Sequence, residues 1–265
     1  MGKTITICFT NNKGGSGKTT TCSNLGAAMA QAGKKVLLID GDMQLNLSLA
    51  FFPEHWVLEQ AKGEKNLYCA IGKQEELSGY VVHTPYENLD LIPSSTLMSS
   101  IEYELFTKWQ REFILRKCIQ KIKDAGNYDY ILIDCMPSLG MITINALAAS
   151  DEVLIPVEAS YLPIKGLQQL LKTIGKVRKQ INPKLQVGGI LFTMVDAHTN
   201  DARNNMELLR NVYGSQIHIF DNYIPFSVRM KEAVREGQSI FSYDPKGKAT
   251  EAYRRVTEEV LKDAI

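Results

Sequence analysis

A glycine-rich segment with two lysines follows the first apolar stretch of this 265-residue sequence. Residues 11–20 read Asn-Asn-Lys-Gly-Gly-Ser-Gly-Lys-Thr-Thr, and a helical pattern follows that stops at Gly33. Glycines let consecutive backbone N–H groups point at phosphate oxygens, and the N-terminus of a following helix attracts anions. Strand, glycine loop, Lys-Thr and helix together are typical of a phosphate-binding loop. The strict motif has glycine where Asn12 stands, so a literal motif search would miss this one.

Each residue type in such a loop has an expected task. Lys18 should lie along the β- and γ-phosphates of a nucleotide, and the Thr19 hydroxyl should hold Mg²⁺. Lys13 is the informative departure, because a second lysine here cannot easily reach phosphates already cradled by its own backbone. It could reach a neighbour's nucleotide; alone, it would be better explained as an exposed loop charge. The predicted phosphate-binding residues are Lys13, Gly14, Gly15, Ser16, Gly17, Lys18, Thr19 and Thr20.

Carboxylates stand at the ends of two apolar runs. Asp40 ends the run 36–39, with Asp42 two residues further on, and Asp134 ends the run 131–133. Continuous apolar runs suit central strands buried on both faces, and open α/β sheets bind ligands at the carboxyl ends of their strands. We therefore expect Asp134 to bind Mg²⁺ through water, and the Asp40 and Asp42 pair to manage Mg²⁺ and water. A pair of carboxylates in a solvated turn or a helix cap is the alternative.

The elements that must position these residues follow from the apolar periodicity. Short β-rich runs alternate with helical patterns, which predicts an α/β fold with a doubly wound, mostly parallel sheet flanked by helices. Apolar residues recur at helical spacing in residues 115–122 and 167–174, so both helices should cover the sheet. Residues 51–86 are the least regular and should form surface helices and loops. The predicted strands are residues 5–9, 36–39, 89–92, 130–133, 153–157, 187–193 and 217–224.

Length and composition indicate that residues 1–265 form a single domain. Hydrophobic residues make up 45% and charged residues 22%, which is enough apolar surface for one large core. Because 30 basic residues nearly cancel 29 acidic ones, any nucleic-acid contact must come from a local patch. The five cysteines form no Cys-x-x-Cys pair, and we see no export signal and no run of ~20 apolar residues. We expect reduced thiols and a cytoplasmic protein.

Three segments carry a resemblance to a known family. Residues 13–19 resemble the deviant Walker A motif of the P-loop family that includes the ParA and Soj partition ATPases, MinD and the nitrogenase iron protein. Residues 40–46 resemble the second acidic motif of that family, Asp-x-Asp-Pro-Gln-Gly-Asn, and residues 134–140 resemble its switch segment, Asp-x-Pro-Pro-Ser-Leu-Gly. The resemblance continues in residues 86–94, 145–147, 151–157, 193–196, 224–225, 228–229, 243–246 and 251–253, so it covers nearly the whole chain.

The sequence departs from these motifs at three positions. Met43 and Met136 replace prolines, and Leu45 replaces a glycine. Proline fixes φ and glycine permits positive φ, so each change is expected to loosen or reshape a loop around the γ-phosphate.

The resemblance also implies roles for individual residues. Lys13 would cross a dimer interface to the partner's nucleotide, Asp42 would orient the attacking water, and Pro225 and Phe226 would lie near adenine. The implied catalytic residues are Lys13, Lys18 and Asp42, and the implied Mg²⁺ residues are Thr19, Asp40 and Asp134.

A modest basic excess lies near the end of the chain, with seven basic and four acidic residues between positions 226 and 255. Charge alone favours a solvated face, whereas the resemblance implies a surface for DNA. The residues predicted to contact DNA are Arg229, Lys231, Arg235, Lys246 and Lys248.

The function implied by the resemblance is an ATP-dependent, Mg²⁺-requiring switch. It would dimerise with ATP, bind DNA non-specifically, hydrolyse ATP slowly under stimulation by a ParB-like centromere-binding partner, and associate with the nucleoid. The glycine loop begins near residue 11, so we expect no N-terminal helix-turn-helix domain. A MinD-like or scaffold-type regulator that uses the same dimer without DNA is the alternative, although the mixed charge of the last helix is a weak membrane signal.

Overall fold

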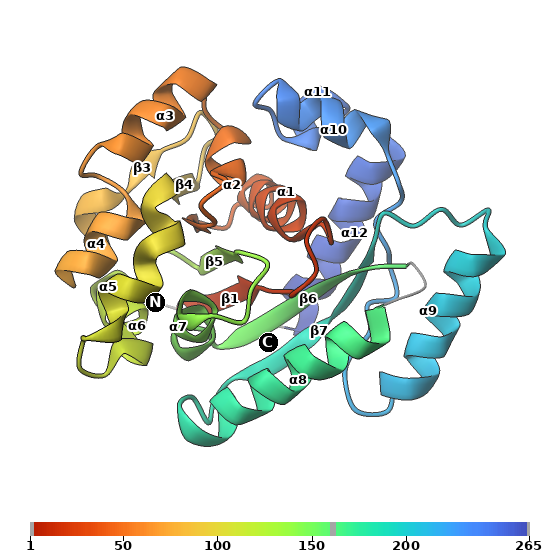
Figure 1. Cartoon of the computed structure of the whole chain (residues 1–265). Coiled ribbons are helices and arrows are strands. Elements are labelled where there is room, and N and C mark those ends of the chain that lie inside the picture. Colours follow the sequence, from red (N-terminus) through yellow and green to blue (C-terminus); the bar gives the residue numbers. More distant parts are fainter. Residues whose placement is uncertain (1–2, 160–162, 264–265) are drawn as a thin grey trace.

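The computed structural model describes residues 3–159 and 163–263, and within them a seven-stranded sheet has the order β3-β4-β2-β5-β1-β6-β7. Neighbouring strands are parallel except β3, which pairs antiparallel with β4 at one edge. The predicted α/β class with a mostly parallel sheet is confirmed (Figure 1). The strands are β1 (Ile5–Phe9), β2 (Val36–Gly41), β3 (Val82–His83), β4 (Leu89–Ile92), β5 (Tyr130–Cys135), β6 (Glu152–Glu158) and β7 (Gln186–Thr193).

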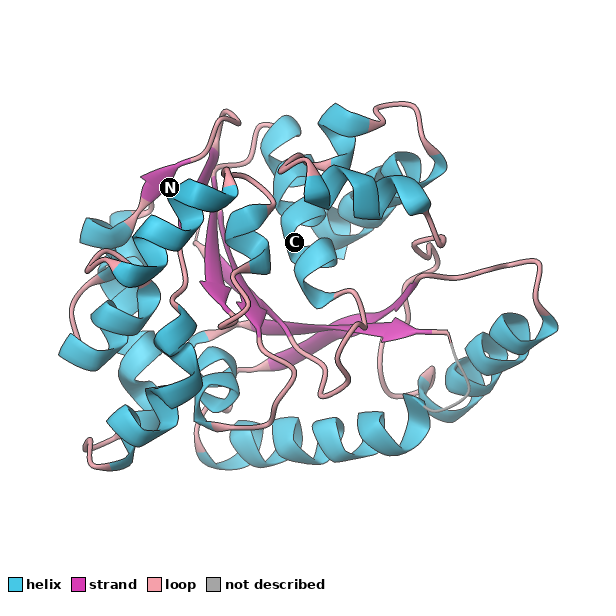
Figure 2. Ribbon diagram, turned by 45° about the horizontal axis from the view of Figure 1, so that its top comes forward, coloured by secondary structure: helices cyan, strands magenta, loops and turns pink. Residues whose placement is uncertain are grey.

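Helices cover both faces of this sheet (Figure 2). In one hydrophobic cluster the helices α4, α5, α6, α7, α8 and α9 pack on one face of the sheet. In a second cluster α1, α2, α10, α11 and α12 pack on the other face. The two helices predicted to cover the sheet are α6 and α8, and both pack on it. The α-helices are α1 (Lys18–Gln31), α2 (Asn46–Leu49), α3 (Glu54–Lys62), α4 (Leu67–Lys73), α5 (Ile101–Phe106), α6 (Ile114–Ala125), α7 (Met141–Ala149), α8 (Pro163–Gln180), α9 (Asn200–Tyr213), α10 (Val228–Arg235), α11 (Ile240–Tyr243) and α12 (Lys248–Asp263), and short 3-10 helices are η1 (Leu77–Tyr80), η2 (Thr96–Ser100) and η3 (Arg111–Phe113).

The prediction of a strand at residues 217–224 is wrong. This segment runs beside β7 but forms no regular strand: isolated bridges join Ile219 to Ile190 of β7 and Pro225 to Val195 beyond its end. Between them the Asp221 N–H donates a 2.9 Å hydrogen bond to Oε1 of Glu259 on α12. That bond directs the backbone toward a helix, so regular pairing with the sheet is interrupted. The other predicted strands are present, with longer ends in several cases.

Residues 51–86 are more buried than predicted. The α4 helix contributes Leu67 and Ile71 to the core, and β3 adds the antiparallel edge strand. The Asn66 side chain caps α4 by accepting a 3.1 Å hydrogen bond from the Cys69 N–H. A helix of seven residues is less than two turns long, which is too short to display a full apolar period in the sequence.

The centre of the sheet explains where the predicted carboxylates lie. Every residue of β2 and β5 is buried, as expected for strands covered on both faces. These strands are neighbours, and their register places Asp40 beside Asp134. A Cβ atom on Gly41 would lie only 2.6 Å from the Asp134 carbonyl oxygen, so glycine is required for this close approach.

Two further predictions can be compared with the described residues. All five cysteines are free thiols, and Cys69 is the one that is not fully buried. Within residues 3–159 and 163–263, no helix combines the length and the apolar character that crossing a membrane would need.

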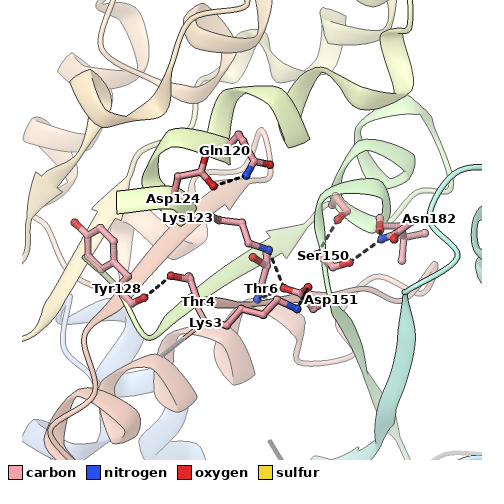
Figure 3. Close-up of polar contacts among 12 residues, drawn as sticks. Lys3, Thr4, Thr6, Gln120, Lys123, Asp124, Tyr128, Ser150, Asp151 and Asn182 are labelled. Carbon is pink, nitrogen blue, oxygen red and sulfur yellow. Dashed lines mark hydrogen bonds and ion pairs between the residues drawn. The ribbon is translucent and has the colours of Figure 1, made fainter. Parts of the chain in front are cut away.

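Asp151 organises the opposite edge of the sheet, where the strands begin (Figure 3). Its Oδ2 accepts hydrogen bonds from the Thr6 N–H at 2.9 Å and from the Lys123 ammonium at 2.8 Å, and Lys3 lies 3.3 Å from Oδ1. Burial alone would raise the pKa of Asp151, but the bonds from Lys123 and Thr6 outweigh it, and the pKa is lowered. One carboxylate therefore ties β1 and α6 to the start of β6.

We predict that Asp151→Asn destabilises the fold at neutral pH by about 2 kcal/mol, because it removes hydrogen bonds to a charged acceptor. A lowered pKa stabilises the fold fully above the ordinary value of about 4, and this contribution is lost as pH falls through the folded-state pKa. The difference between variant and wild type should therefore vanish in acid. Chemical denaturation from pH 7 to pH 2 measures it. Asp124→Asn, which alters an exposed carboxylate bonded to Gln120, is the control; equal effects of both substitutions would contradict this role of Asp151.

Candidate functional site

A pocket of about 510 Å³ opens where the central strands end. Its walls include residues 14–20, Asp42, Pro137, Thr193 and residues 224–227. The glycine loop and the predicted adenine segment therefore face one cavity, although more than 200 residues separate them in the chain. The carboxyl ends of the strands are where parallel sheets bind their ligands.

The glycine loop presents backbone donors to this pocket. Gly15 and Gly17 have φ of 73° and 81°, conformations that only glycine adopts without strain. The α1 helix begins directly at Lys18; its first turn has no acidic residue and no side-chain cap. The first N–H groups of a helix lack intrahelical partners, and their dipoles favour an anion. This loop is therefore built to bind phosphate.

The loop is anchored by residues that sequence reasoning did not assign. Asn11 Nδ2 donates to the Pro156 carbonyl on β6 at 2.7 Å, and Thr193 Oγ1 donates to the Ser16 carbonyl at 2.9 Å. Both bonds join the loop to strands that follow far along the chain. The predicted topology contains a signal for these residues. The strands β6 and β7 also end at this edge of the sheet, so residues at their ends lie near the loop.

The two lysines of the loop lie in different environments. Lys18 is buried, and its ammonium donates to the Lys13 carbonyl at 3.1 Å. Burial lowers the pKa of Lys18, while Asp134 and Asp42 oppose that shift. The Lys13 side chain is 47% exposed, and its Nζ lies 2.5 Å from Oε2 of Glu158 at the end of β6. Among the described residues, Lys18 lines the pocket and Lys13 does not.

Asp134 is the least satisfied polar group of the site. It is fully buried, and neither carboxylate oxygen has a hydrogen-bond partner among the described residues. Burial raises the pKa of Asp134 well above the ordinary value, and the neighbouring carboxylates of Asp40 and Asp42 add to the shift. Thr19 and Lys18 oppose it. A buried carboxylate without a partner is costly, so these oxygens are suited to bind a cation or a hydrogen-bond donor.

Asp40 is also buried, but its oxygens are occupied. Oδ2 accepts bonds from the Ser48 N–H at 2.9 Å and the Ser48 hydroxyl at 2.6 Å, and Oδ1 accepts from the Asp42 N–H at 3.2 Å. Burial raises the pKa of Asp40 to about 6, while the Ser48 bonds lower it. Asp40 therefore fixes the turn into α2. Its predicted place near the metal stays a prediction.

The chemistry of these residues fits a Mg²⁺ ion bound together with phosphates. Mg²⁺ prefers oxygen ligands, keeps several waters and needs only one or two protein groups beside a nucleotide. The Thr19 hydroxyl and the open oxygens of Asp134 supply such groups. Across residues 3–159 and 163–263, no three His, Cys, Asp or Glu side chains are grouped to hold a metal without a nucleotide.

The loop after Asp42 keeps the backbone shape of a glycine without having one. Leu45 has φ of 61°, in the left-handed region, and is the N-cap residue directly before α2. That conformation costs about 1–2 kcal/mol for a residue with a side chain. The side chain is buried against Val57 and Ala61, and burying a leucine contributes about 1.5–3 kcal/mol, which offsets the strain. Leucine at this position thus retains the turn, and Asp42 lines the pocket with Oδ1 bonded to the Gln44 N–H.

Pro225 and Phe226 lie at the pocket, as their predicted role requires. The Phe226 N–H donates to the Val195 carbonyl at 3.0 Å, and the ring is 53% exposed. The Lys231 ammonium lies 5.5 Å from the centre of that ring and also lines the pocket. Lys231, predicted to contact DNA, is therefore placed at the nucleotide side.

The other residues predicted to contact DNA are divided among different surroundings. Arg229 lies 3.1 Å from Glu232, and Arg235 lies 3.8 Å from Glu236. Lys246 and Lys248 instead line a separate hollow of about 490 Å³. The five residues therefore have different surroundings, and their contact with DNA stays a prediction.

The fold and the glycine loop define the class: a P-loop nucleotide-binding α/β protein. A family model described as an AAA domain matches residues 4–187. The sporulation initiation inhibitor protein Soj of Bacillus subtilis is 41% identical over 260 residues, which cover 98% of each chain. The chromosome-partitioning ATPase Soj of Treponema pallidum is 39% identical over 261 residues, again 98% of each chain. The chain belongs to the family of ParA and Soj partition ATPases.

A solved structure agrees with this assignment at the level of the fold and the ligand. Cobyrinic acid a,c-diamide synthase from Mycobacterium smegmatis, solved with bound ADP and magnesium, has a TM-score of 0.83 and 28% sequence identity. The match covers 98% of this chain and 94% of that chain.

We predict that Asp134→Asn stabilises the ligand-free protein. A raised carboxyl pKa destabilises the fold above that pKa and has no effect below the ordinary value of about 4, so the gain should be largest in alkaline solution. Each kcal/mol that the substitution adds to the free energy of unfolding should raise Tm by about 2–4 °C in a chain of this size. Calorimetry without nucleotide at pH 8 and at pH 4 measures this. Asp221→Asn, which neutralises an exposed carboxylate, is the control; a lower Tm for Asp134→Asn at pH 8 would show that Asp134 has a partner.

Proposed function

We propose that this chain is an ATP-driven dimerisation switch that binds DNA without sequence preference and partitions chromosome, plasmid or mobile-element DNA. The observation that carries the proposal is the pocket in which a phosphate-binding loop, a buried lysine and a buried carboxylate without a partner converge. Family membership supplies the ATPase class, and a solved relative in fold holds ADP and magnesium.

ATP and Mg²⁺ fill this pocket in the proposed active state. The phosphates lie against residues 14–20, Lys18 contacts the β- and γ-phosphates, and Pro225 and Phe226 lie beside adenine. Thr19 and Asp134 hold Mg²⁺, which neutralises charge that develops on the phosphates. The apolar ring of Phe226 and the ammonium of Lys231 form one wall of the pocket, which suits a flat heteroaromatic base.

Dimerisation is the step assigned to Lys13. Its ammonium lies at Glu158, outside the set of residues that line the pocket, so it is placed at the molecular surface rather than at its own phosphates. An exposed ion pair is worth about 0–1 kcal/mol, which is little to give up when a partner's nucleotide offers a higher negative charge. We infer that Lys13 exchanges Glu158 for the partner's phosphates.

Hydrolysis is assigned to a water molecule oriented by Asp42. This carboxylate lines the pocket and keeps one oxygen free of the Gln44 bond, so that oxygen can accept a proton or a hydrogen bond from water. Slow turnover, stimulated by a ParB-like centromere-binding protein, would let the ATP dimer persist on DNA. The proposed location is the cytoplasm, in association with the nucleoid.

We predict that Lys13→Ala and Lys18→Ala fail at different steps. Lys18→Ala should abolish nucleotide binding, because it removes the buried cation that faces the phosphates. Lys13→Ala should bind ATP with an affinity within about threefold of wild type but should not dimerise, because the contact that it removes is intermolecular. Calorimetric titration measures binding, and light scattering with ATP and Mg²⁺ measures dimerisation.

Lys34→Ala is the matched control, because it removes a lysine distant from the pocket lining. It should change neither binding nor dimerisation. A Lys13→Ala protein that dimerises normally with ATP would refute the trans role of this lysine.

A further inference from the structure

The α8 helix and the turn that follows form the most one-sided charged segment of the chain. Residues 163–184 contain six basic residues and no acidic residue. The formal net charge of the whole protein is +1, so all other residues together carry −5. A cationic segment on an otherwise anionic molecule directs any negatively charged partner to one surface.

Three lysines of α8 form a stripe on its exposed side. At 100° per residue, Lys172, Lys176 and Lys179 fall within about 60° of one another around the helix axis, and at 1.5 Å per residue they extend over about 10 Å. All three are exposed and line a hollow of about 380 Å³ together with Gln169, Thr173 and Gln180. We call these three lysines the α8 stripe. The other lining side chains are neutral hydrogen-bonding groups, so the hollow contains nothing that repels an anion.

The α8 stripe differs from the C-terminal arginines in its pairing. Within residues 3–159 and 163–263, no carboxylate lies within 4 Å of any of the three ammonium groups. In contrast, Arg229 pairs with Glu232, and Arg254 and Arg255 lie 3.7 Å and 3.2 Å from Glu251. A cation that already has a carboxylate must lose it before it can neutralise a phosphate, whereas the α8 stripe loses nothing.

Two kinds of polyanion could bind the α8 stripe, a nucleic acid and an anionic membrane, and the opposite side of α8 distinguishes them. Leu167, Leu170, Ile174 and Val177 are buried in the core against the sheet. An amphipathic helix binds a membrane by inserting its apolar face, and this face is already used. The helix lies on the outside of the molecule (Figure 1), and the hollow on its exposed side is lined by cations, neutral polar groups and one glycine. A charged phosphate backbone, contacted without base readout, fits that surface.

We propose that the α8 stripe is a phosphate-contacting surface for double-stranded DNA. This inference rests on the proposed DNA-binding function and adds α8 to the surface that would contact DNA. The apolar anchor holds the stripe rigidly on the sheet, so the lysines bind DNA as a fixed row. A dimer presents two such rows.

The test is a salt titration of DNA binding by the full-length protein with a slowly hydrolysed ATP analogue and Mg²⁺. The variant Lys172→Gln/Lys176→Gln/Lys179→Gln should bind at least about tenfold more weakly. The slope of log affinity against log salt should become shallower by about five, because six contacts per dimer contribute about 0.9 each. Glutamine keeps the helix propensity, so the fold should be retained.

Two further variants make the result specific. Lys62→Gln/Lys65→Gln/Lys117→Gln removes three exposed lysines elsewhere and changes the net charge equally, and it should bind DNA as the wild type does. Lys172→Arg/Lys176→Arg/Lys179→Arg keeps the charges and should also retain binding. Nucleotide affinity and ATP-dependent dimerisation, measured on each variant, should match those of the wild type.

Contradictory results separate the two levels of the argument. If the wild type binds DNA and the glutamine variant binds equally well, the α8 stripe is not the contact surface, while the proposed function stands. If the wild type binds no DNA with any nucleotide, the proposed function fails together with this inference. Binding to vesicles with anionic lipids is measured in parallel. If the wild type binds these vesicles and the glutamine variant does not, while the variant still binds DNA, the stripe is a membrane contact and the inference is overturned.

Discussion

At the end of the central strand β5, the Asp134 carboxylate is fully buried and has no hydrogen-bond partner among the described residues. Its position follows from the sheet, because β5 lies between β2 and β1 and its register brings Asp134 level with Asp40 and Phe9. Burial leaves both acids poorly solvated and raises the pKa of each, and the charge of Asp40 adds to the shift at Asp134. Positive charge that enters the pocket would therefore stabilise the ionised form of Asp134.

The surrounding residues stabilise the charged form of one acid more than that of the other. Ser48 donates two hydrogen bonds to Asp40, so this acid is stabilised within the protein itself. At Asp134 the Thr19 hydroxyl and the buried ammonium of Lys18 favour the charged form, but they do not outweigh the effect of burial. The site therefore holds one acid that organises a turn and another that is open toward the ligand. Environments that differentiate paired carboxylates in this way are common at functional sites.

The sequence predicted the parts of this site that depend on local pattern. The glycine loop, the strand-end acids and the helices over the sheet lie where apolar periodicity and motif spacing placed them, because each is defined within a few residues. Leu45 was expected to reshape its loop, yet the left-handed turn is retained, since burial of the leucine side chain compensates for its strain.

Other features depend on contacts between residues far apart in the chain, and no local pattern encodes those. Glu158 meets Lys13 across 145 positions, and Thr193 bonds the glycine loop across 177 positions. The bond from Asp221 to Glu259 on α12 likewise replaces the strand that residues 217–224 were expected to form. The sequence could not show which cations are paired, for the same reason. In the structure Arg229 pairs with Glu232, whereas the lysines of α8 are exposed.

The central claim is that Asp134 is held ready for a cation that arrives with the nucleotide. Thermal unfolding of the wild type with ATP alone, Mg²⁺ alone and both together tests it most directly, because a ligand that binds the folded state raises Tm according to its affinity. The account predicts that both together raise Tm by more than the two separate increases combined, and that EDTA removes this excess. An increase with ATP that is the same in EDTA and in Mg²⁺ would contradict it.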